Sequence, residues 1–593
     1  MNLCSNGKNP FTGRMSAGPI KWLEWDDETL KRAADLDRPI CLCVINNTSR
    51  WSHAMKDNFG HDEIVKMLNN DFIPVMVDCA DAPHLALVAR ATSQIMMGYS
   101  GWPLFLFLTP SKKPIFAAAY MPTDSEDTHV PGLLQVLRRI KWLWLMKRSQ
   151  LNFSADSYGI QLEGALHPYT APAPDRLAEL AATRLLEDED VRNGGFGGVP
   201  KFPHASKLLL AAWLIENGTE SEKLSSLFDR ALTTIASGGL YDHIGGGFHD
   251  YCRDGEWKQP YLGKHLEQNT AILLAFIEGA RILKKPFCNR IIEETLSAIV
   301  RAFDLGGLLS SGEDVGSSQE VDPYYLWDFD EIGEVLGESA EAFRSAFGVT
   351  REGNYAAPLT QQPTRKNVLN MTGHGQEELA YLFFDEKKKL LQARSGRRLP
   401  ELEKRISVRG NAAFAALLAR AARILGMSNC LDQAAKLLET LLNEAVHDGK
   451  LCHMLYDGAP HGQASLDDVA SLVWACIELY RAGHEDRWLE AAKEWSHRAD
   501  ELFGSEGAMR LTPEASTDIV PTWEGGDDTL PSGNGVMLNN LVTLASLTGE
   551  KGWEDRAGQI VHAFGGALAE YPCVCAFLTV GALRLQALNA SKK

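Results

Sequence analysis

The sequence predicts a multidomain fold of two parts, an N-terminal α/β sandwich and a C-terminal all-α toroid. The chain has 593 residues, which is too long for one ordinary hydrophobic core. Between about residues 20 and 150, short apolar runs alternate with amphipathic ones, whereas from about 175 onward strand patterns nearly vanish. We therefore place one domain at 1–150, a linker at 151–174 and a second domain at 175–593.

The first domain has the pattern of a βαβ unit followed by a β-hairpin, the layout of a thioredoxin-like sandwich. The expected helices are "DETLKRAADLDR", "HDEIVKMLNN" and "PHLALVARATSQIM". The expected strands are "PICLCVIN", "FIPVMVD", "PLFLFLTP" and "PIFAAAYM". On the first of these strands Cys41 and Cys43 are two residues apart, so they share one face and suit core packing.

Two features of this domain bear on chemistry. The stretch "TSRWSH" lies between a predicted buried strand and a predicted helix, and it holds Ser49, Trp51, Ser52 and His53. Pro103 comes just before the hairpin, where a thioredoxin-like fold places a cis-proline, although a proline at an ordinary strand start explains it equally well.

The second domain is predicted to consist almost entirely of helices. Their expected ranges are 175–188, 204–216, 221–237, 264–284, 288–304, 376–392, 409–426, 430–446, 466–482, 486–502, 533–548, 552–569 and 574–589. The links between them alternate between short and long, as expected for about six helical hairpins in a toroid with its long loops on one face. An α-solenoid is the alternative, but its repeats should show a sequence period and none is visible.

Composition excludes several classes of protein. A net charge of −18, spread along the chain, disfavours nucleic acid and anionic membranes as partners. No apolar run is long enough to span a membrane and no signal peptide is evident, so a cytoplasmic location is expected. The cysteines and histidines lack metal-ligand spacing, and we expect neither a metal nor another cofactor.

The densest polar cluster is the glycine-rich loop "GGLYDHIGGGFHDYCRDGEWKQPYLGKHLEQNT". Carbohydrate sites combine aromatic platforms with carboxylate and imidazole groups, and His and Glu serve as acids and bases near neutral pH. A solvated loop that caps the toroid would have the same composition. The candidate residues in this loop are Asp242, His243, His249, Trp257, Lys264, His265 and Glu267.

Further candidates precede other predicted helices, where capping is the alternative explanation. His204 begins one helix, and a helix N-terminus favours a neutral imidazole that could act as a base. Asp467 and Asp468 begin another. The remaining candidates are Asp314, Asn411, Trp523, Glu524, Asp528 and Asn534.

The ordered motifs "PIKWLEW", "SRWSHAM", "GYSGWPLFLFLTP", "GGFGGVPKFPH", "GGLYDHIGGGFHDY", "SLDDVASLV" and "DTLPSGNGV" resemble the spermatogenesis-associated protein 20 family. This resemblance covers nearly the whole chain. It implies a thioredoxin-like domain fused to an (α/α)6 domain similar to six-hairpin glycosidases and N-acylglucosamine 2-epimerases. Asp242, His249, Lys264, Asp467, Asp468 and Asn534 match the family motifs.

The chain also departs from the family pattern. Where the family has Thr-Cys-His-Trp-Cys-His, this chain has serines at 49 and 52, and a serine can neither form a disulfide nor supply a thiolate. The family's His-Phe-Glu-Lys stretch is Tyr-Leu-Gly-Lys at 261–264, which removes an acid. Of the family's Asp-Asp-Lys and Thr-Ser-Trp-Asn-Gly stretches, only Asn411 and a basic residue remain.

These observations lead to two main hypotheses. In the first, a redox-inactive thioredoxin-like domain accompanies a toroid that binds a carbohydrate-like molecule, with epimerase-like or glycosidase-like chemistry at His243, His249, Asp467 and Asp468. In the second, the protein is a non-catalytic binding or scaffolding module. A hydroxyl nucleophile at Ser49 or Ser52 is a weaker third hypothesis, because no oxyanion-hole motif is visible. The thioredoxin-like domain is a candidate docking site for a protein partner.

Overall fold

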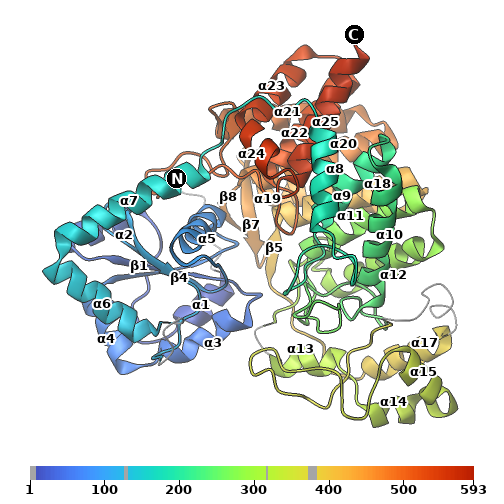
Figure 1. Cartoon of the computed structure of the whole chain (residues 1–593), viewed down its shortest axis with the longest axis horizontal. Helices are drawn as coiled ribbons and strands as arrows, with labels where there is room; N and C mark the ends of the chain where they lie inside the picture. Colours follow the sequence, from blue (N-terminus) through green and yellow to red (C-terminus); the bar gives the residue numbers. More distant parts are fainter. Residues whose placement is uncertain (1–8, 126–130, 316–317, 372–382, 593) are drawn as a thin grey trace. The chain divides into compact units, whose positions relative to one another are not determined.

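The computed structural model describes residues 9–125, 131–315, 318–371 and 383–592 (Figure 1). The chain divides into two compact units. Unit 1 contains the chain up to His167 together with Ala459–Gly462 and Arg510–Glu524, and unit 2 contains the remainder.

Unit 1 is a four-stranded sheet with helices on both faces, and its strand order is β2-β1-β3-β4. Strands β1 and β2 are parallel, whereas β3 pairs antiparallel with β1 and β4. The strands are β1 (Ile40–Ile45), β2 (Ile73–Asp78), β3 (Leu104–Leu108) and β4 (Pro114–Ala118). The helices are α1 (Pro10–Ser16), α2 (Asp27–Leu36), α3 (Arg50–Asn58), α4 (Asp62–Asp71), α5 (Pro83–Met97), α6 (Leu133–Met146) and α7 (Arg148–Leu166). This topology confirms the predicted thioredoxin-like sandwich.

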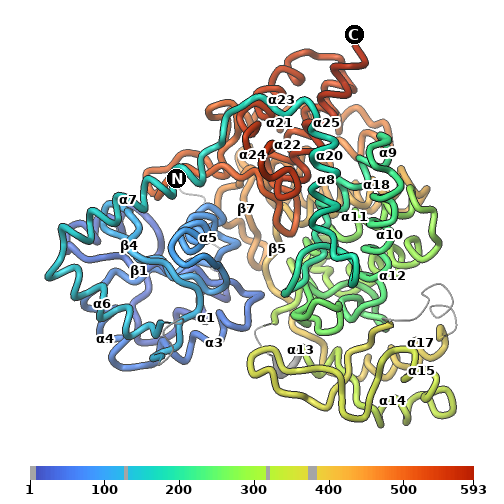
Figure 2. Tube along the Cα trace, viewed as in Figure 1, coloured from blue at the N-terminus to red at the C-terminus, as the bar shows by residue number. Residues whose placement is uncertain are grey.

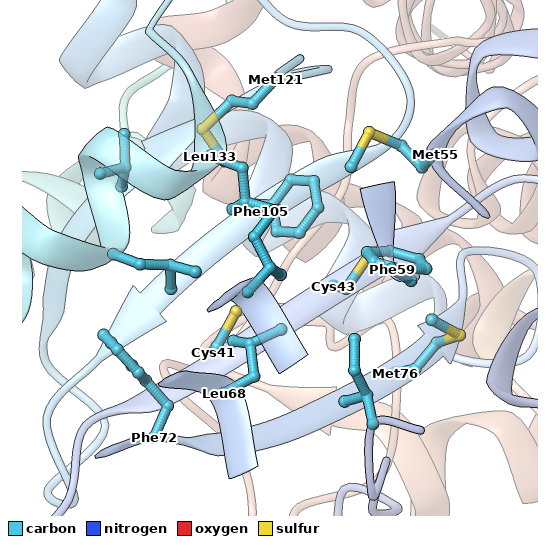
Figure 3. Packing of buried hydrophobic residues seen from close by; sticks show 14 of the residues in the cluster. Cys41, Cys43, Met55, Phe59, Leu68, Phe72, Met76, Phe105, Met121 and Leu133 are labelled. Carbon is cyan, nitrogen blue, oxygen red and sulfur yellow. The ribbon is translucent and has the colours of Figure 1, made fainter. Parts of the chain in front are cut away.

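Strand β1 is buried on both faces, so its side chains alternate between two hydrophobic clusters. Cys41 and Cys43 point to one face, where they pack with Phe105 and with residues of α3, α4 and α6 (Figure 3). Leu42 and Val44 point to the other face, toward α5 and α7. The predicted packing role of the two cysteines is confirmed.

The boundary between the two parts differs from the prediction. Residues 151–166, which the sequence analysis treats as part of a linker, belong to α7 and to unit 1. Leu151, Ala155, Leu162 and Leu166 recur at helical spacing and are buried. The exposed Phe153 and Ile160 place apolar side chains on the opposite face as well, so the buried stripe does not stand out in the sequence.

Two later segments of the chain also belong to unit 1. Lys112 Nζ donates a hydrogen bond of 2.7 Å to the backbone carbonyl of Ser516, and Trp25 Nε1 donates one of 3.1 Å to that of Thr517. Ile519 and Val520 pack against the same apolar cluster as β1. The unit therefore depends on residues that lie far away in the sequence.

Unit 2 is a closed ring of inner helices surrounded by outer helices. The course of its chain can be followed by colour in Figure 2, from α8 to the C-terminus. The inner helices are α9 (Ala205–Glu216), α11 (Leu266–Leu283), α18 (Val408–Leu425), α20 (Leu466–Gly483), α22 (Gly533–Thr548) and α25 (Ala576–Ser591). Each contacts the next in this order, and α25 contacts α9, so the ring closes. The outer helices are α8 (Leu177–Asp188), α10 (Ser221–Ser237), α12 (Pro286–Phe303), α19 (Asn429–Ala445), α21 (Asp486–Phe503) and α23 (Lys551–Ala563). The predicted (α/α)6 toroid is confirmed.

A short antiparallel pairing follows five of the outer helices, although no period is visible in the sequence. The paired residues are Glu189 with Phe196, Tyr241 with Phe248, Asp304 with Leu309, Val446 with Leu451, and Gly504 with Met509. In three of the repeats an asparagine near the start of the inner helix both donates to and accepts from the backbone of the second residue of the pair. These are Asn269 with Phe248, Asn411 with Leu309, and Asn534 with Met509. Asn411 and Asn534, predicted as substrate-binding residues, thus anchor helix starts.

The remaining elements lie in the longer links. Between α12 and α18 are α13 (Ser318–Tyr325), α14 (Phe329–Leu336), the 3-10 turn η1 (Gly337–Ser339), α15 (Ala340–Ala346) and α17 (Phe384–Arg394), several of which share a small core around Phe343 and Phe347. The other elements are β5 (Arg405–Ser407), β6 (Val446–His447), β7 (Lys450–Tyr456), β8 (Ala459–Gln463), β9 (Gly504–Ser505), β10 (Ala508–Met509) and α24 (Gly565–Glu570). The start of the predicted helix 376–392 lies outside the described residues.

Candidate functional site

Asp242, in the glycine-rich loop, is a buried carboxylate with two cationic partners. Arg394 donates two hydrogen bonds to its oxygens, both of 2.9 Å, and Lys264 Nζ donates a third of 2.7 Å. Burial alone would raise the pKa of Asp242, but these two cations hold it well below its usual range. Asp242 and Lys264 therefore form part of a closed ionic cluster that fixes the loop.

His243 and His249, the predicted catalytic bases, are buried in the same loop, with exposed fractions of 4% and 2%. Burial lowers the pKa of each to about 3, so both rings are neutral at physiological pH. His243 Nε2 lies 3.0 Å from the carbonyl oxygen of Gly238, and His249 Nδ1 accepts a hydrogen bond of 3.2 Å from the Gly263 N–H. In the structure both histidines hold backbone in place.

Trp257 and His265 also make internal contacts. Trp257 is 1% exposed, and its Nε1 donates to the carbonyl oxygen of Asn193, so its ring is not an open sugar platform. His265 Nδ1 lies 2.7 Å from an oxygen of Asp250. Burial lowers the pKa of His265, but Asp250 and the nearby Glu403 and Glu313 outweigh it and raise the pKa to about 9.

A second group of residues, three of which are predicted site residues, lies at the N-terminal ends of α11, α18, α20 and α22. We call this group the N-terminal mouth and define it as Glu267, Arg409, Asp467, Asp468 and Asp527. Arg409 joins three of the helix starts, since its Nη1 lies 3.2 Å from Asp467 Oδ2 and its Nη2 donates to the carbonyl oxygens of Leu530 and Pro531. Ser407 donates a hydrogen bond of 3.0 Å to Glu267.

Asp467 is the least satisfied carboxyl group in this mouth. It is 5% exposed, and its Oδ1 has no hydrogen bond of good geometry among the described residues, although the Gly533 backbone N–H is close enough to lower the pKa of the carboxyl group. Burial raises the pKa of Asp467, Arg409 lowers it, and Asp468 and Glu267 raise it further, with a net upward shift. Such a group is suited to proton transfer.

Asp468, the neighbouring acid, has a structural environment. Its Oδ2 accepts hydrogen bonds from the Ser465 backbone N–H at 2.7 Å and from the Ser465 hydroxyl at 2.8 Å, and His453 Nδ1 lies 2.5 Å away. The Arg409 N–H donates to Oδ1 at 3.1 Å. Asp468 thus closes the start of α20, as the capping interpretation predicts.

Asp527 is a mouth residue that the sequence analysis did not select. It accepts hydrogen bonds from the backbone N–H groups of Ser532 at 3.0 Å and Phe577 at 2.8 Å, so it ties α22 to α25. Burial nevertheless raises its pKa to about 6. Its sequence neighbours, Asp528 and Glu524, were equally plausible because nothing in "WEGGDDT" separates inward-facing from outward-facing acids.

The other predicted residues are dispersed. His204 has a left-handed backbone, and burial lowers the pKa of its ring to about 4, while Asp528 is exposed and acts on that ring through its charge. Asp314 is half-buried, and its backbone N–H donates to Glu401. Trp523 and Glu524 belong to unit 1, where the Trp523 ring lies 5.0 Å from that of His167.

Some residues with important contacts are not among the predicted site residues. Arg394 pairs with Asp242 across 152 positions of sequence, and no motif surrounds it. Tyr325 donates its hydroxyl to Glu313 and packs edge-on against His249 at 4.7 Å. His453 is on a strand whose other residues are mostly buried, so it could have been noticed as a polar residue in an apolar run.

In unit 1, the "TSRWSH" stretch forms the end of a loop and the first turn of α3. Ser49 is the N-cap of α3 and accepts a hydrogen bond from the Ser52 N–H, and Ser52 is buried and accepts one of 3.1 Å from the Asn46 N–H. His53 Nε2 lies 2.9 Å from the carbonyl oxygen of Asn47. The Trp102–Pro103 peptide is cis, and the Ser49 hydroxyl donates to the carbonyl oxygen of Trp102 at 3.4 Å.

None of the helices in the described ranges is both long enough and apolar enough to cross a membrane. No group of at least three His, Cys, Asp or Glu side chains among the described residues has an arrangement able to hold a metal ion.

The two units define the class of this protein as a thioredoxin-like sandwich joined to a six-hairpin helical toroid. Residues 1–163 match a thioredoxin-like, DsbH-type family described as "Protein of unknown function, DUF255". The chain is 28% identical to spermatogenesis-associated protein 20 of Rattus norvegicus, over 96% of this chain and 79% of that protein. Its identity to the Homo sapiens protein of that name is 27%, over 95% and 78%. These relatives confirm the resemblance that the motifs indicate.

Solved structures resemble the toroid at low sequence identity. A D-mannose isomerase aligns with 71% of this chain and all of its own, with a TM-score of 0.45 and 10% identity. The cellobiose 2-epimerase of Spirochaeta thermophila aligns with 70% of this chain and all of its own, with a TM-score of 0.43 and 12% identity.

Proposed function

We propose that unit 2 binds a carbohydrate-like small molecule at the N-terminal mouth and that Asp467 is its principal acid–base group. The observation that carries this proposal is the buried Asp467 carboxyl group, whose Oδ1 has no well-formed hydrogen bond within the described residues. A buried polar atom in this state is costly unless a ligand completes its bonding. A sugar hydroxyl supplies both a donor and acceptors and fits that requirement.

The chemistry follows from the neighbours of Asp467. In its protonated form the carboxyl group can donate a proton to a sugar oxygen, and Arg409 at 3.2 Å then stabilises the carboxylate that remains. Glu267 is close enough to influence the pKa of Asp467 and is our candidate for the second group, which accepts a proton or positions a hydroxyl. This pair takes the place of His243 and His249, because one ring nitrogen of each histidine contacts backbone and burial keeps both rings neutral at physiological pH.

A second candidate function is binding without turnover. It is favoured by the ionic cluster at Asp242, where two cations satisfy both carboxylate oxygens and leave no group to transfer a proton. Under this candidate the mouth recognises a ligand, and Asp467 only hydrogen-bonds to it.

For unit 1 we propose a role in docking a partner, without thiol–disulfide exchange. Ser49 and Ser52 replace the thiols, and burial raises the pKa of Cys41 and Cys43 far above the thiolate range. Trp51 is 41% exposed beside Tyr120 and offers a partner an apolar contact. The ten described cysteines are free thiols, as expected for a protein that functions in a reducing compartment such as the cytoplasm.

The test is NMR spectroscopy of the full-length protein with a panel of neutral mono- and disaccharides in D2O. An epimerase or isomerase incorporates deuterium at a carbon next to the carbonyl, and a glycosidase produces new reducing-end signals. A binder gives saturation-transfer signals without either change. Asp467→Asn should abolish turnover or weaken binding, whereas the exposed control Glu494→Gln should behave as wild type. If no sugar gives any of these signals, the proposal is wrong.

A further inference from the structure

A second charged region lies at the other end of the inner helices, where a cavity of about 330 Å³ opens inside the ring. On three inner helices its charged residues follow mouth residues by eleven positions, namely Glu278 after Glu267, Arg420 after Arg409 and Glu478 after Asp467. Eleven residues are close to three helical turns, so each pair shares one face, separated by ~16 Å along the axis. The cavity is therefore distinct from the mouth.

Most of the charges around this cavity are paired. Glu278 accepts hydrogen bonds from Arg281 and Arg420, and Glu478 accepts them from Arg420 and Arg423, with Arg481 at 3.4 Å. The lining nevertheless contains five arginines and only three glutamates. The cavity thus carries an excess of positive charge inside a protein whose net charge is −18.

Arg584 is the source of much of this excess. Its guanidinium donates to Asn539 Oδ1 and to Thr543 Oγ1, both at 2.9 Å, and no carboxylate of the described residues pairs with it. The pKa of Arg584 is lowered to about 10, chiefly by burial and also by Arg481 and Arg420, while Glu478 opposes the shift. These cations repel one another, and a bound anion would relieve that repulsion.

Helix geometry explains only part of this pattern. Arg281, Arg423 and Arg481 lie in the last turns of their helices, where cations complement the helix dipole. Arg584 lies in the middle of α25, so the dipole does not account for it. Trp213, Trp474 and Phe577 also line the cavity and add apolar surface beside the guanidinium groups.

We propose that this cavity binds a small phosphate-bearing molecule of sugar-phosphate size, with the phosphate held by Arg584 and Arg481. Planar guanidinium groups recognise phosphate through paired, charge-assisted hydrogen bonds. The volume is at the small end of ligand pockets, which suits one hexose-sized body against the aromatic side chains. This site is independent of the function proposed for the mouth.

The experiment is isothermal titration calorimetry of the full-length protein at low salt with glucose 6-phosphate, glucose and inorganic phosphate. We expect the two phosphates to bind and glucose not to bind at this site, with sugar phosphate binding more tightly than inorganic phosphate. Arg584→Gln and Arg481→Gln should each weaken phosphate binding by at least about tenfold. Arg584→Lys should retain part of the affinity, and Arg487→Gln, on the exposed face of α21, should leave it unchanged.

Two results would overturn the proposal. The first is binding that is equally strong in wild type, Arg584→Gln and Arg481→Gln, which would indicate adventitious binding at the surface. The second is the absence of binding by both phosphates. Far-UV circular dichroism and thermal melting show whether each variant is folded. If one of the two glutamine variants fails to fold, the other decides.

Discussion

Asp242 and Asp467 are both buried acids of unit 2, but their surroundings differ. Asp242 receives hydrogen bonds from Arg394 and Lys264, and its pKa is held well below the usual range. Asp467 has one arginine at 3.2 Å and two acidic neighbours, and its pKa is raised. Burial is the same in both cases, so the partners decide which carboxyl group is locked as an anion and which can exchange a proton.

This difference teaches how to separate structural from functional acids in the toroid. Both residues match family motifs, so the sequence ranks them equally. The structure separates them by whether internal cations satisfy the carboxyl oxygens. Breaking the locked cluster should affect folding, whereas altering the unsatisfied group should affect the ligand.

The largest expected effect comes from Asp242→Asn. Removing this charge leaves Arg394 and Lys264 buried without their common counter-ion, and breaking a buried ion pair in this way costs ~3–5 kcal/mol. Urea denaturation should show the free energy of unfolding reduced by this amount. The matched control is Glu494→Gln, which removes an exposed partner of Arg498 and should cost under ~1 kcal/mol. Equal stability of Asp242→Asn and wild type would refute the structural role.

Asp467→Asn should leave folding stability nearly unchanged and reduce turnover instead. Asparagine resembles the neutral acid, so folding stability should stay within ~1 kcal/mol of wild type. Turnover of any sugar substrate should fall by ~10²–10⁴-fold, the usual contribution of a general acid or base. Rate measurements check the expected loss of turnover, and urea denaturation of the same sample checks the expected stability. A variant that unfolds but keeps its specific activity would contradict the assignment.

Asp527 should make the free energy of unfolding depend on pH. Because its folded pKa of about 6 exceeds the unfolded value, its contribution to stability is fully present below the unfolded pKa and is lost as pH rises through about 6. Asp527→Asn removes this titration. Between pH 4.5 and 7.5 the variant should therefore gain ~2 kcal/mol relative to wild type, as measured by urea denaturation at each pH. A difference that does not change with pH would mean that Asp527 does not titrate in this range.

The smallest expected effect is in unit 1. Ser49→Ala removes the N-cap of α3 and should lower stability by ~1 kcal/mol. It should leave sugar turnover or binding by unit 2 unchanged.

Insulin-reduction assays of wild type should show no activity above background. Thiol–disulfide exchange by the wild-type protein would show that our redox-inactive assignment is wrong.

Much of the fold could be predicted because its signals are local. The helix predicted at 221–237 and α10 have the same bounds, and α22 likewise matches 533–548, since periodicity and flanking glycines mark their ends. The order of short and long links was enough to predict the toroid. In contrast, α7 and the small helices α14 and α15 were missed, because their burial depends on contacts distant in sequence.

The site was harder to predict than the fold. The sequence identifies His249 and Asp467 equally as polar residues in conspicuous motifs. It does not show that His249 contacts the backbone of Gly263, or that the hydrogen bonding of Asp467 is incomplete. Those distinctions depend on which groups come together in three dimensions. Arg394, 152 positions from Asp242, is the clearest example of such a partner.

The most direct test of the central claim is calorimetric titration of a panel of neutral mono- and disaccharides into wild type, Asp467→Asn and His249→Ala. Our account predicts that at least one sugar binds wild type and that Asp467→Asn weakens its binding at least about tenfold. Folded His249→Ala should retain that binding. Sugar binding that survives Asp467→Asn and is lost in folded His249→Ala would contradict the account and place the site at the glycine-rich loop.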